Sequence, residues 1–141
     1  MLYRILLPLS LVFLTAACTQ NDAANGPDTP APDLSGMSAP QQVVYLIELD
    51  QYEQALDILG DADQDDPQVM QLKKDTHLLY GLWLTYSADS VQMSERMGGA
   101  LRHFRKVLEL DPGNSRAQAE IDQIEGIYTQ MGRPIPEGVA D

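Results

Sequence analysis

Residue types that carry most catalytic and metal chemistry are scarce in this sequence of 141 residues. It has one cysteine, Cys18, and two histidines, His77 and His103. No carboxylate or cysteine stands at ligand spacing from either histidine, so the two do not define a zinc site and we expect no metal. No serine or threonine lies in a nucleophile-elbow context, and no glycine-rich loop follows a strand. We therefore expect no catalytic residue, no cofactor and a protein that is not an enzyme.

Positive charge is also scarce. Lysine and arginine total 9 against 21 aspartates and glutamates, which gives a formal net charge of −12. A chain this acidic repels phosphate backbones, which argues against nucleic acid as a partner. The length is that of one small domain, and a hydrophobic content of 44% is ordinary for a globular chain.

Long apolar runs are missing except at the N-terminus, where Ile5 to Phe13 is too short to span a membrane. Residues 1–17 have the profile of a secretory signal peptide, and Cys18 follows two alanines. This ending resembles the lipobox of bacterial lipoproteins, although Thr15 stands where that family prefers leucine. The resemblance implies cleavage before Cys18 and a covalent lipid on its sulfur. The alternative is an ordinary secretory signal that leaves a free thiol.

The lipoprotein resemblance also implies a location in the bacterial cell envelope, with the membrane contacted through the lipid anchor. Thr19, rather than aspartate, follows the cysteine, which favours the outer membrane facing the periplasm. Residues 18–36 form a linker rich in Asn, Asp, Ala and Pro, with too few large apolar residues to build a core. We expect a helical domain over residues 37–132 and a loosely ordered tail over 133–141.

The segment from Ala100 to Pro112 carries an apolar face at helical spacing. An alanine is followed by phenylalanine four positions later, by a small apolar residue three further on, and by a closing Asp-Pro: Ala100, Phe104, Val107 and Pro112. This pattern resembles the second helix of the tetratricopeptide repeat (TPR). The same spacing recurs more weakly in Ala55, Leu59, Ala62 and Pro67.

The TPR resemblance implies an all-α fold, a short α-solenoid of two antiparallel helix pairs followed by a C-terminal capping helix. Ser38 to Gln41 opens a first helix that runs to about residue 49, and further helices are expected over 52–59, 67–87, 90–110 and 115–131. Gly60 and Gly132 are expected to stop two of them. The third helix has apolar residues at helical spacing from Val69 through Leu79 to Tyr86, and the last helix buries Ala117, Ile121, Ile124, Tyr128 and Met131.

The second pair is unusually long. Its signature alanine lies 45 residues after the first, whereas a standard repeat has about 34 residues. Because the difference is close to three helical turns, we interpret it as a lengthening of both helices around a turn at 87–90. The alternative keeps helices of standard length and places a loop over 88–97, which the costly pair Gly98-Gly99 favours.

Two sets of residues are candidate contact sites. The TPR resemblance places Val44, Ile47, Glu48, Gln71, Lys74 and Leu78 in a partner-binding groove. Alternatively Val44, Ile47 and Leu78 are core residues, and Lys74 stands where some family members hold a carboxylate, although the accompanying asparagines are absent. A basic docking face is formed by Arg102, Arg105 and Lys106 and would suit anionic headgroups. Its alternative is a solvated helix face with an Arg105–Glu109 pair.

The cluster Asp61, Asp63 and Asp65 has calcium-loop spacing but lacks the glycine and the final glutamate, so we interpret it as a solvated acidic turn. The sequence as a whole predicts a membrane-anchored periplasmic lipoprotein with a TPR-like protein-interaction domain, an adaptor or scaffold in envelope assembly or secretion. Its partner would be another envelope protein or a second copy. The alternative is a periplasmic carrier of a small apolar ligand held between the long helices.

Overall fold

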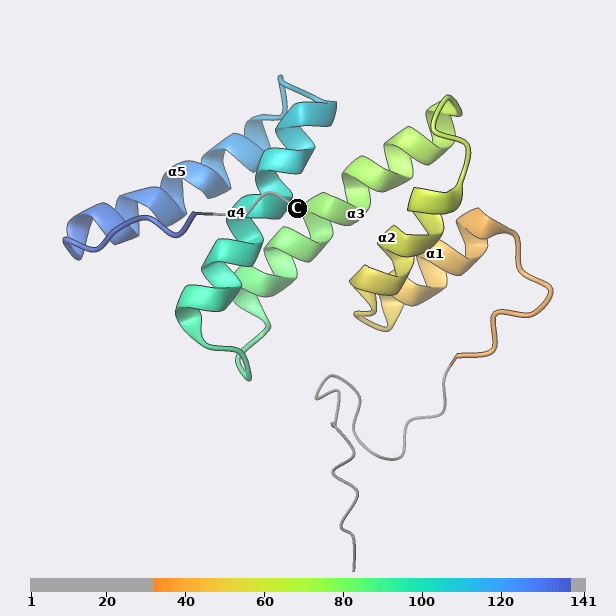
Figure 1. Ribbon diagram of the computed structural model, residues 1–141, viewed down its shortest axis with the longest axis horizontal. Coiled ribbons are helices and arrows are strands. Elements are labelled where there is room, and N and C mark those ends of the chain that lie inside the picture. The colour runs from red at the N-terminus through yellow and green to blue at the C-terminus, as the bar shows by residue number, and fades with distance from the viewer. Residues whose placement is uncertain (1–31, 138–141) are drawn as a thin grey trace, which may run out of the picture. The chain divides into compact units, whose positions relative to one another are not determined.

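The computed structural model describes residues 32–137, and this part of the chain is all-α. Its five helices are α1 (Ala39–Glu48), α2 (Tyr52–Asp61), α3 (Pro67–Tyr86), α4 (Met93–Leu110) and α5 (Ser115–Gln130) (Figure 1). None of these helices is both long and apolar enough to cross a membrane. The predicted signal peptide, Cys18 and the last four residues lie outside the described range.

Side chains just before the helices set where they start. Asp66 accepts a hydrogen bond from the backbone N–H of Gln68 at 2.8 Å, and a proline fills the first position of α3. Asn114 accepts from the backbone N–H of Ala117 at 3.0 Å and starts α5. Gln41 accepts from the backbone N–H of Ser38 at 2.9 Å, as the opening of α1 predicted.

The prediction that Gly60 stops α2 was wrong, because the helix continues to Asp61. Its end is satisfied from outside the helix: the Gln64 side-chain amide donates to the carbonyls of Leu59 at 2.8 Å and Ala62 at 2.6 Å. A terminus whose carbonyls have such a donor does not need a glycine in the left-handed conformation.

The two long helices of the prediction are confirmed, and the alternative of a loop over 88–97 was wrong. The turn between them is longer than expected, so α4 starts at Met93 rather than at residue 90. Gly98 and Gly99 lie within α4. A Cβ on Gly99 would come within 3.0 Å of Leu84 Cδ1, so close packing of α4 on α3 accounts for a small residue there.

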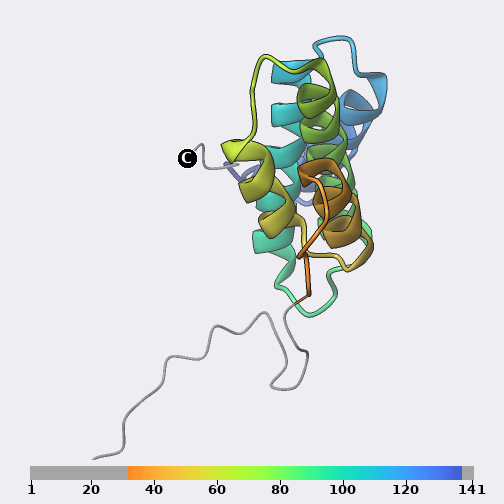
Figure 2. The same cartoon turned by 90° about the vertical axis from the view of Figure 1, so that its right-hand side faces the viewer.

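Each helix packs against the next one in the chain, and α1 also contacts α3. The most extensive packing joins α3 to α4. Figure 2, turned from the view of Figure 1, shows α2 and α4 on one side of the helical unit and α1, α3 and α5 on the other. The unit therefore has two helix layers.

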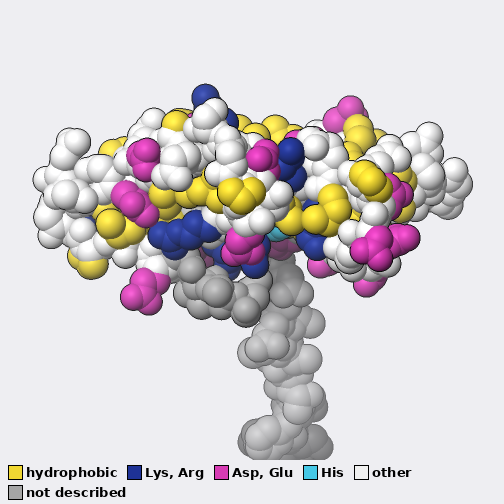
Figure 3. Space-filling model, turned by 90° about the horizontal axis from the view of Figure 1, so that it is seen from above, with side chains coloured by type: hydrophobic (Ala, Val, Ile, Leu, Met, Phe, Trp, Pro, Cys, Tyr) yellow, Lys and Arg dark blue, Asp and Glu magenta, His cyan; other side chains and the backbone are white. Residues whose placement is uncertain are grey.

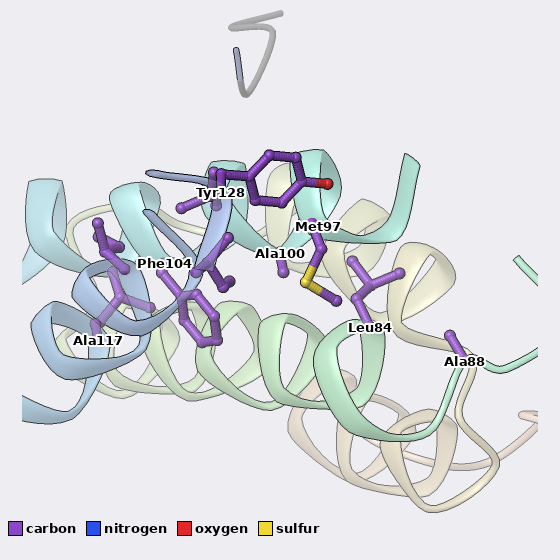
Figure 4. Packing of buried hydrophobic residues seen from close by; sticks show 11 residues of the cluster. Leu84, Ala88, Met97, Ala100, Phe104, Ala117 and Tyr128 are labelled. Atoms are coloured by element: carbon purple, nitrogen blue, oxygen red, sulfur yellow. The ribbon is translucent and has the colours of Figure 1, made fainter. Parts of the chain in front are cut away.

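The larger apolar core, here called the second cluster, joins the C-terminal half of α3 to α4 and α5. Its centre is Phe104, which is fully buried and whose ring points toward the ribbon of α3 in Figure 4. A Cβ on Gly81 would lie 2.6 Å from that ring, so glycine is required where the two helices meet. The buried members are Leu84, Ala88, Met97, Ala100, Leu101, Phe104, Val107, Ala117, Ile121, Ile124 and Tyr128.

The smaller core, the first cluster, joins α1 and α2 to the start of α3. Its buried members are Val43, Leu46, Ala55, Leu59 and Val69. Leu34, in the predicted linker, packs against this cluster, and the Gln42 amide donates to the Met37 carbonyl at 3.0 Å. The first cluster thus extends to residues that precede α1.

Three residues of the apolar patterns that predicted α3 and α5 are exposed. Met131 is 44% exposed because no further described helix covers that end of α5, and its predicted burial was wrong. Leu79 and Tyr86 are 41% and 52% exposed. Helix α3 packs on α2 along one side and on α4 along another, so its buried positions follow these two contacts rather than the apolar spacing. A helix with two contact sides does not bury a single regular stripe.

Candidate functional site

The predicted groove residues on α1 lie at a shallow apolar pocket. Val44 is 47% exposed. The other residues that line this pocket are Met37, Pro40, Gln41, Tyr45 and Glu48. The pocket has a volume of about 380 Å³. Ile47 is instead half-buried against the first cluster. Val44, Ile47 and Leu78 were predicted to lie either in the groove or in the core, and of these three Val44 is the one that lies at the surface.

The predicted groove residues on α3 have partners within the chain. Gln71 donates to the carboxylate of Asp75 at 2.9 Å, and Leu78 packs against the second cluster. Lys74 Nζ lies 3.3 Å from Asp111 Oδ2 at the end of α4. A hydrogen bond from Asn114 and this ion pair lower the pKa of Asp111. A carboxylate from a partner would have to compete with Asp111 for Lys74.

The predicted basic docking face is divided by the structure. Arg105 pairs with Glu125 on α5 at 3.3 Å, and Lys106 pairs with Glu109 at 2.9 Å. The Arg105–Glu109 pair of the alternative interpretation is therefore absent. Arg105 turns toward α5 because the facing carboxylate there is within reach. Arg102 and Lys106 instead line a cleft between α2, α3 and α4.

This cleft, here called the three-helix cleft, has a volume of about 430 Å³. That volume lies within the range of about 300–1,000 Å³ that small-molecule sites occupy. Figure 3 shows a histidine near the middle of one face of the unit, with basic side chains beside it. The cleft is lined by Glu53, Leu56, Asp57 and Gly60 of α2, by Lys73, His77 and Tyr80 of α3, and by Arg102, His103 and Lys106 of α4.

Both histidines of the sequence meet at the floor of the three-helix cleft. The Nδ1 atoms of His77 and His103 are 3.0 Å apart, so one ring donates its proton to the other. Burial, with help from Lys73 and Lys106, lowers the pKa of His77 to about 4. Burial also lowers the pKa of His103 to about 3, and His77 and Arg102 add to this effect. Both imidazoles are therefore neutral at pH 7.

Aromatic rings continue from the histidines along the same wall. Tyr80 lies with its ring centroid 4.2 Å from that of His103, and it stacks on Tyr52 at 5.0 Å with the rings 10° from parallel. The Tyr80 hydroxyl donates to Glu53 Oε1 at 2.9 Å. Burial and this bond raise the pKa of Tyr80, which keeps it a neutral donor. The stack fixes the position of the histidine pair.

The sequence did not predict that the histidines meet, because they are 26 positions apart on different helices. The predicted helix pair did contain a signal for this contact. In long antiparallel helices joined by a short turn, the middle of one helix faces the middle of the other, and His77 and His103 lie near the middles of α3 and α4. The pair has no third ligand, and the described residues contain no group of three or more histidine, cysteine, aspartate or glutamate side chains that could hold a metal ion. The arrangement offers hydrogen-bond donors and charges of both signs.

The acidic turn between α2 and α3 is exposed and satisfied within itself. Asp63 Oδ1 accepts a hydrogen bond from the backbone N–H of Asp65 at 3.0 Å. The backbone carbonyl of Asp63 accepts another from the backbone N–H of Asp66 at 3.2 Å. These bonds describe a turn that leads into the cap of α3.

Comparison with known proteins gives no match: no family model, no curated protein and no solved structure matches this chain.

Proposed function

We propose that this protein is a lipid-anchored protein of the bacterial envelope, held in the membrane by Cys18. Its helical unit is a TPR-like module that binds another envelope protein and acts as an adaptor. Two features of the sequence support this function, the lipobox-like ending at Cys18 and the repeated spacing that closes at Pro67 and Pro112.

The helix arrangement supports a TPR-like module. In stacked helix pairs the first helices form one layer and the second helices form the other, as α1, α3 and α5 lie opposite α2 and α4. The contact of α1 with α3 is the contact between successive first helices that such stacking requires. The signature Phe104 fills the space against Gly81, where the two helices of the second pair approach closely.

The observation that carries the binding role is the exposure of Val44. A valine with nearly half its surface in water, beside Tyr45 and Met37, forms an apolar patch next to the charged Glu48. Such a pattern, an apolar centre with a charged rim, is typical of protein contact surfaces. Between the long helices, by contrast, Phe104 and its neighbours fill the space, which favours the adaptor over a carrier of an apolar ligand.

The test is site-specific photo-crosslinking in intact cells. A photoreactive residue at position 44 or 48 is expected to capture one envelope protein, whereas the same residue at the exposed position 122 on α5 captures none. The captured protein is then purified and titrated against the full chain. Val44→Asp should abolish both the crosslink and the binding, while Asp122→Lys should change neither. Equal capture at positions 44 and 122 would contradict the proposed surface.

The anchor has a separate test. Labelled fatty acid should be incorporated into the wild-type protein, and the protein should sediment with outer membranes. Cys18→Ser should lose both properties, because several acyl chains supply the membrane affinity at about 0.8 kcal/mol for each buried CH₂. A serine variant that still sediments with membranes would contradict the lipid anchor and leave the binding test unaffected.

A further inference from the structure

The three-helix cleft separates charges of opposite sign onto opposite walls. Its α2 wall carries the carboxylates Glu53 and Asp57, and its α3–α4 wall carries Lys73, Arg102 and Lys106. In a chain with a net charge of −12, three cations around one cavity are an unusual concentration. The two walls of the cleft therefore carry opposite charge.

The two walls nevertheless do not pair. Within residues 32–137, no ion pair joins Glu53 or Asp57 to any of the three cations. Glu53 bonds instead to the Tyr80 hydroxyl, and Lys73 donates to the neutral Gln64 side chain at 2.8 Å. Lys106 pairs with Glu109 of its own helix at 2.9 Å, so an anionic group of a ligand would share Lys106 with that carboxylate. Opposite charges that face each other without contact leave a space in which a dipolar molecule is attracted by both walls.

The ends of the cleft differ in a way that orients such a molecule. Near the end of α2 the wall is Gly60, which has open space where a side chain would begin. Lys73 reaches this end, because it donates to the Gln64 side chain, whose amide donates to the Gly60 carbonyl at 3.4 Å. Lys106 acts on His77 together with Lys73. Asp57 and Glu53 lie one and two turns earlier on α2. At 1.5 Å per residue these carboxylates stand about 5–10 Å from Gly60 along the helix axis.

Of the two histidines on the floor of the cleft, His77 is the more accessible. His103 is 6% exposed, and its Nε2 atom is buried without a hydrogen-bond partner among the described residues, so a ligand in the open cleft does not reach that atom. His77 is half-buried and lines the cleft.

We propose that the three-helix cleft binds a small zwitterion, with its anionic group at Lys73 and Lys106 and its ammonium group at Asp57 and Glu53. The half-buried imidazole of His77, one helical turn after Lys73 on α3, offers a hydrogen bond between these two ends. Neither group alone satisfies both walls, so the site selects molecules that carry both charges a few ångströms apart. This inference is independent of the adaptor role, because that role rests on Val44 on α1, outside the cleft.

The probe is the dipeptide Ala-Ala, whose free amino and carboxylate groups lie about 7 Å apart when extended. Calorimetry and amide NMR shifts on the full chain are expected to show millimolar or tighter binding, with shifts at Asp57, Gly60, Lys73 and Arg102. N-acetyl-Ala-Ala lacks the ammonium charge and Ala-Ala amide lacks the carboxylate. Each should bind at least about tenfold more weakly, the effect of losing roughly 1.4 kcal/mol.

Matched variants separate a specific site from general surface charge. Asp57→Asn and Lys73→Gln should each weaken Ala-Ala binding about tenfold, while Asp122→Asn on α5 should leave it unchanged. Asp57→Asn should also bind Ala-Ala and N-acetyl-Ala-Ala equally, because the carboxylate that recognises the ammonium is gone. An unfolded variant would bind neither, and an unchanged thermal unfolding curve identifies the folded variants.

Several outcomes would overturn the proposal. The absence of heat and of NMR shifts with millimolar Ala-Ala would mean that the walls do not act together. Equal binding of N-acetyl-Ala-Ala, acetate or phosphate would reduce the site to a simple anion site. Equal binding of the amide would reduce it to a cation site, and shifts outside the cleft would place the binding elsewhere.

Discussion

The first and second clusters differ in size and in the way helices enclose them. The first cluster has five buried members from α1, α2 and the start of α3, whereas the second has eleven members, centred on Phe104 between α3, α4 and α5. Larger cores bury more apolar area per residue, so the second cluster contributes most of the stability. The first cluster depends on α3, which the second one holds in place.

Between the two clusters lies a layer of buried and half-buried polar and aromatic residues. Thr76 is fully buried and donates to the Leu72 carbonyl at 2.7 Å, and Tyr52, Tyr80, His77 and His103 continue the layer. No continuous apolar core crosses this layer within the described residues. Hydrogen bonds and ring stacking therefore join the helical unit in its middle.

A cavity in the second cluster should lower the free energy of unfolding more than any other change considered. Phe104→Ala is expected to cost about 3–5 kcal/mol, because it leaves a cavity against Gly81 that neither helix can close. Urea unfolding of the full chain measures the loss. Ile127→Ala, at a position that is 39% exposed on α5, serves as the control and should change stability little. A loss below about 1 kcal/mol would contradict the central place of Phe104.

Breaking the first cluster should have a smaller and more local effect. Leu46→Ala removes a fully buried side chain and is expected to cost about 2–3 kcal/mol. Because the polar layer separates the clusters, hydrogen exchange should speed up in α1 and α2 while α4 and α5 keep their protection. Equal acceleration in all five helices would show that the clusters unfold as one.

The polar layer itself should respond to acid. The folded pKa values of His77 and His103 lie below the ordinary value of 6.5, so the unfolded chain binds more protons as pH falls. Their stabilising effect is complete above pH 6.5 and is lost toward pH 4. From pH 7 to pH 5 we expect a loss of about 2 kcal/mol in all, after a discount for the part-exposed His77.

The control for this pH effect is the double variant His77→Asn with His103→Phe, which keeps a polar and an aromatic side chain but removes both titrating groups. Urea unfolding at the two pH values should show a smaller decrease in the variant. An equal decrease would assign the acid sensitivity to other groups, the carboxylates first among them.

The smallest change in stability is expected at two glycines in open surroundings, one in α2 and one in α5. Gly60 in α2 and Gly126 in α5 have no neighbouring atom within 4 Å of the place that a Cβ would occupy. Replacing either by alanine should stabilise its helix by about 0.5–1 kcal/mol. Gly81→Ala should instead destabilise, because its Cβ would meet the Phe104 ring. Thermal unfolding of the three variants gives the order, and a stabilising Gly81→Ala would contradict the packing described for α3 and α4.

Local signals in the sequence predicted most of the helices. Asp66 and Pro67 start α3 as expected, and spacing alone predicted the extra helical turns of the second pair. Gly60 misled the prediction, because Gln64 supplies the terminal hydrogen bonds from the following turn. A side chain that folds back over four or five positions has no signature in helical periodicity.

The site was less predictable than the fold. Val44 and Glu48 were assigned to a surface groove by resemblance, and they do line a pocket on α1. The three-helix cleft escaped prediction because it needs α2, α3 and α4 in their final register, which depends on the turns after Asp61 and after Tyr86. Residues such as His77 and His103 acquire their chemistry only from that register.

The single tryptophan of the sequence, Trp83, lies where α3 meets α2. Its ring centroid is 5.9 Å from that of Tyr52 and 6.1 Å from that of Tyr80. Trp83 also packs against the second cluster. Its fluorescence therefore reports on the middle of the helical unit, where α2 meets α3, while the far-ultraviolet circular dichroism reports on all the helices. If α1 and α2 detach first, the emission will shift at lower denaturant than the dichroism; if the unit unfolds in one step, the two curves will coincide. The chain thus carries its own optical probe of how its two halves are coupled.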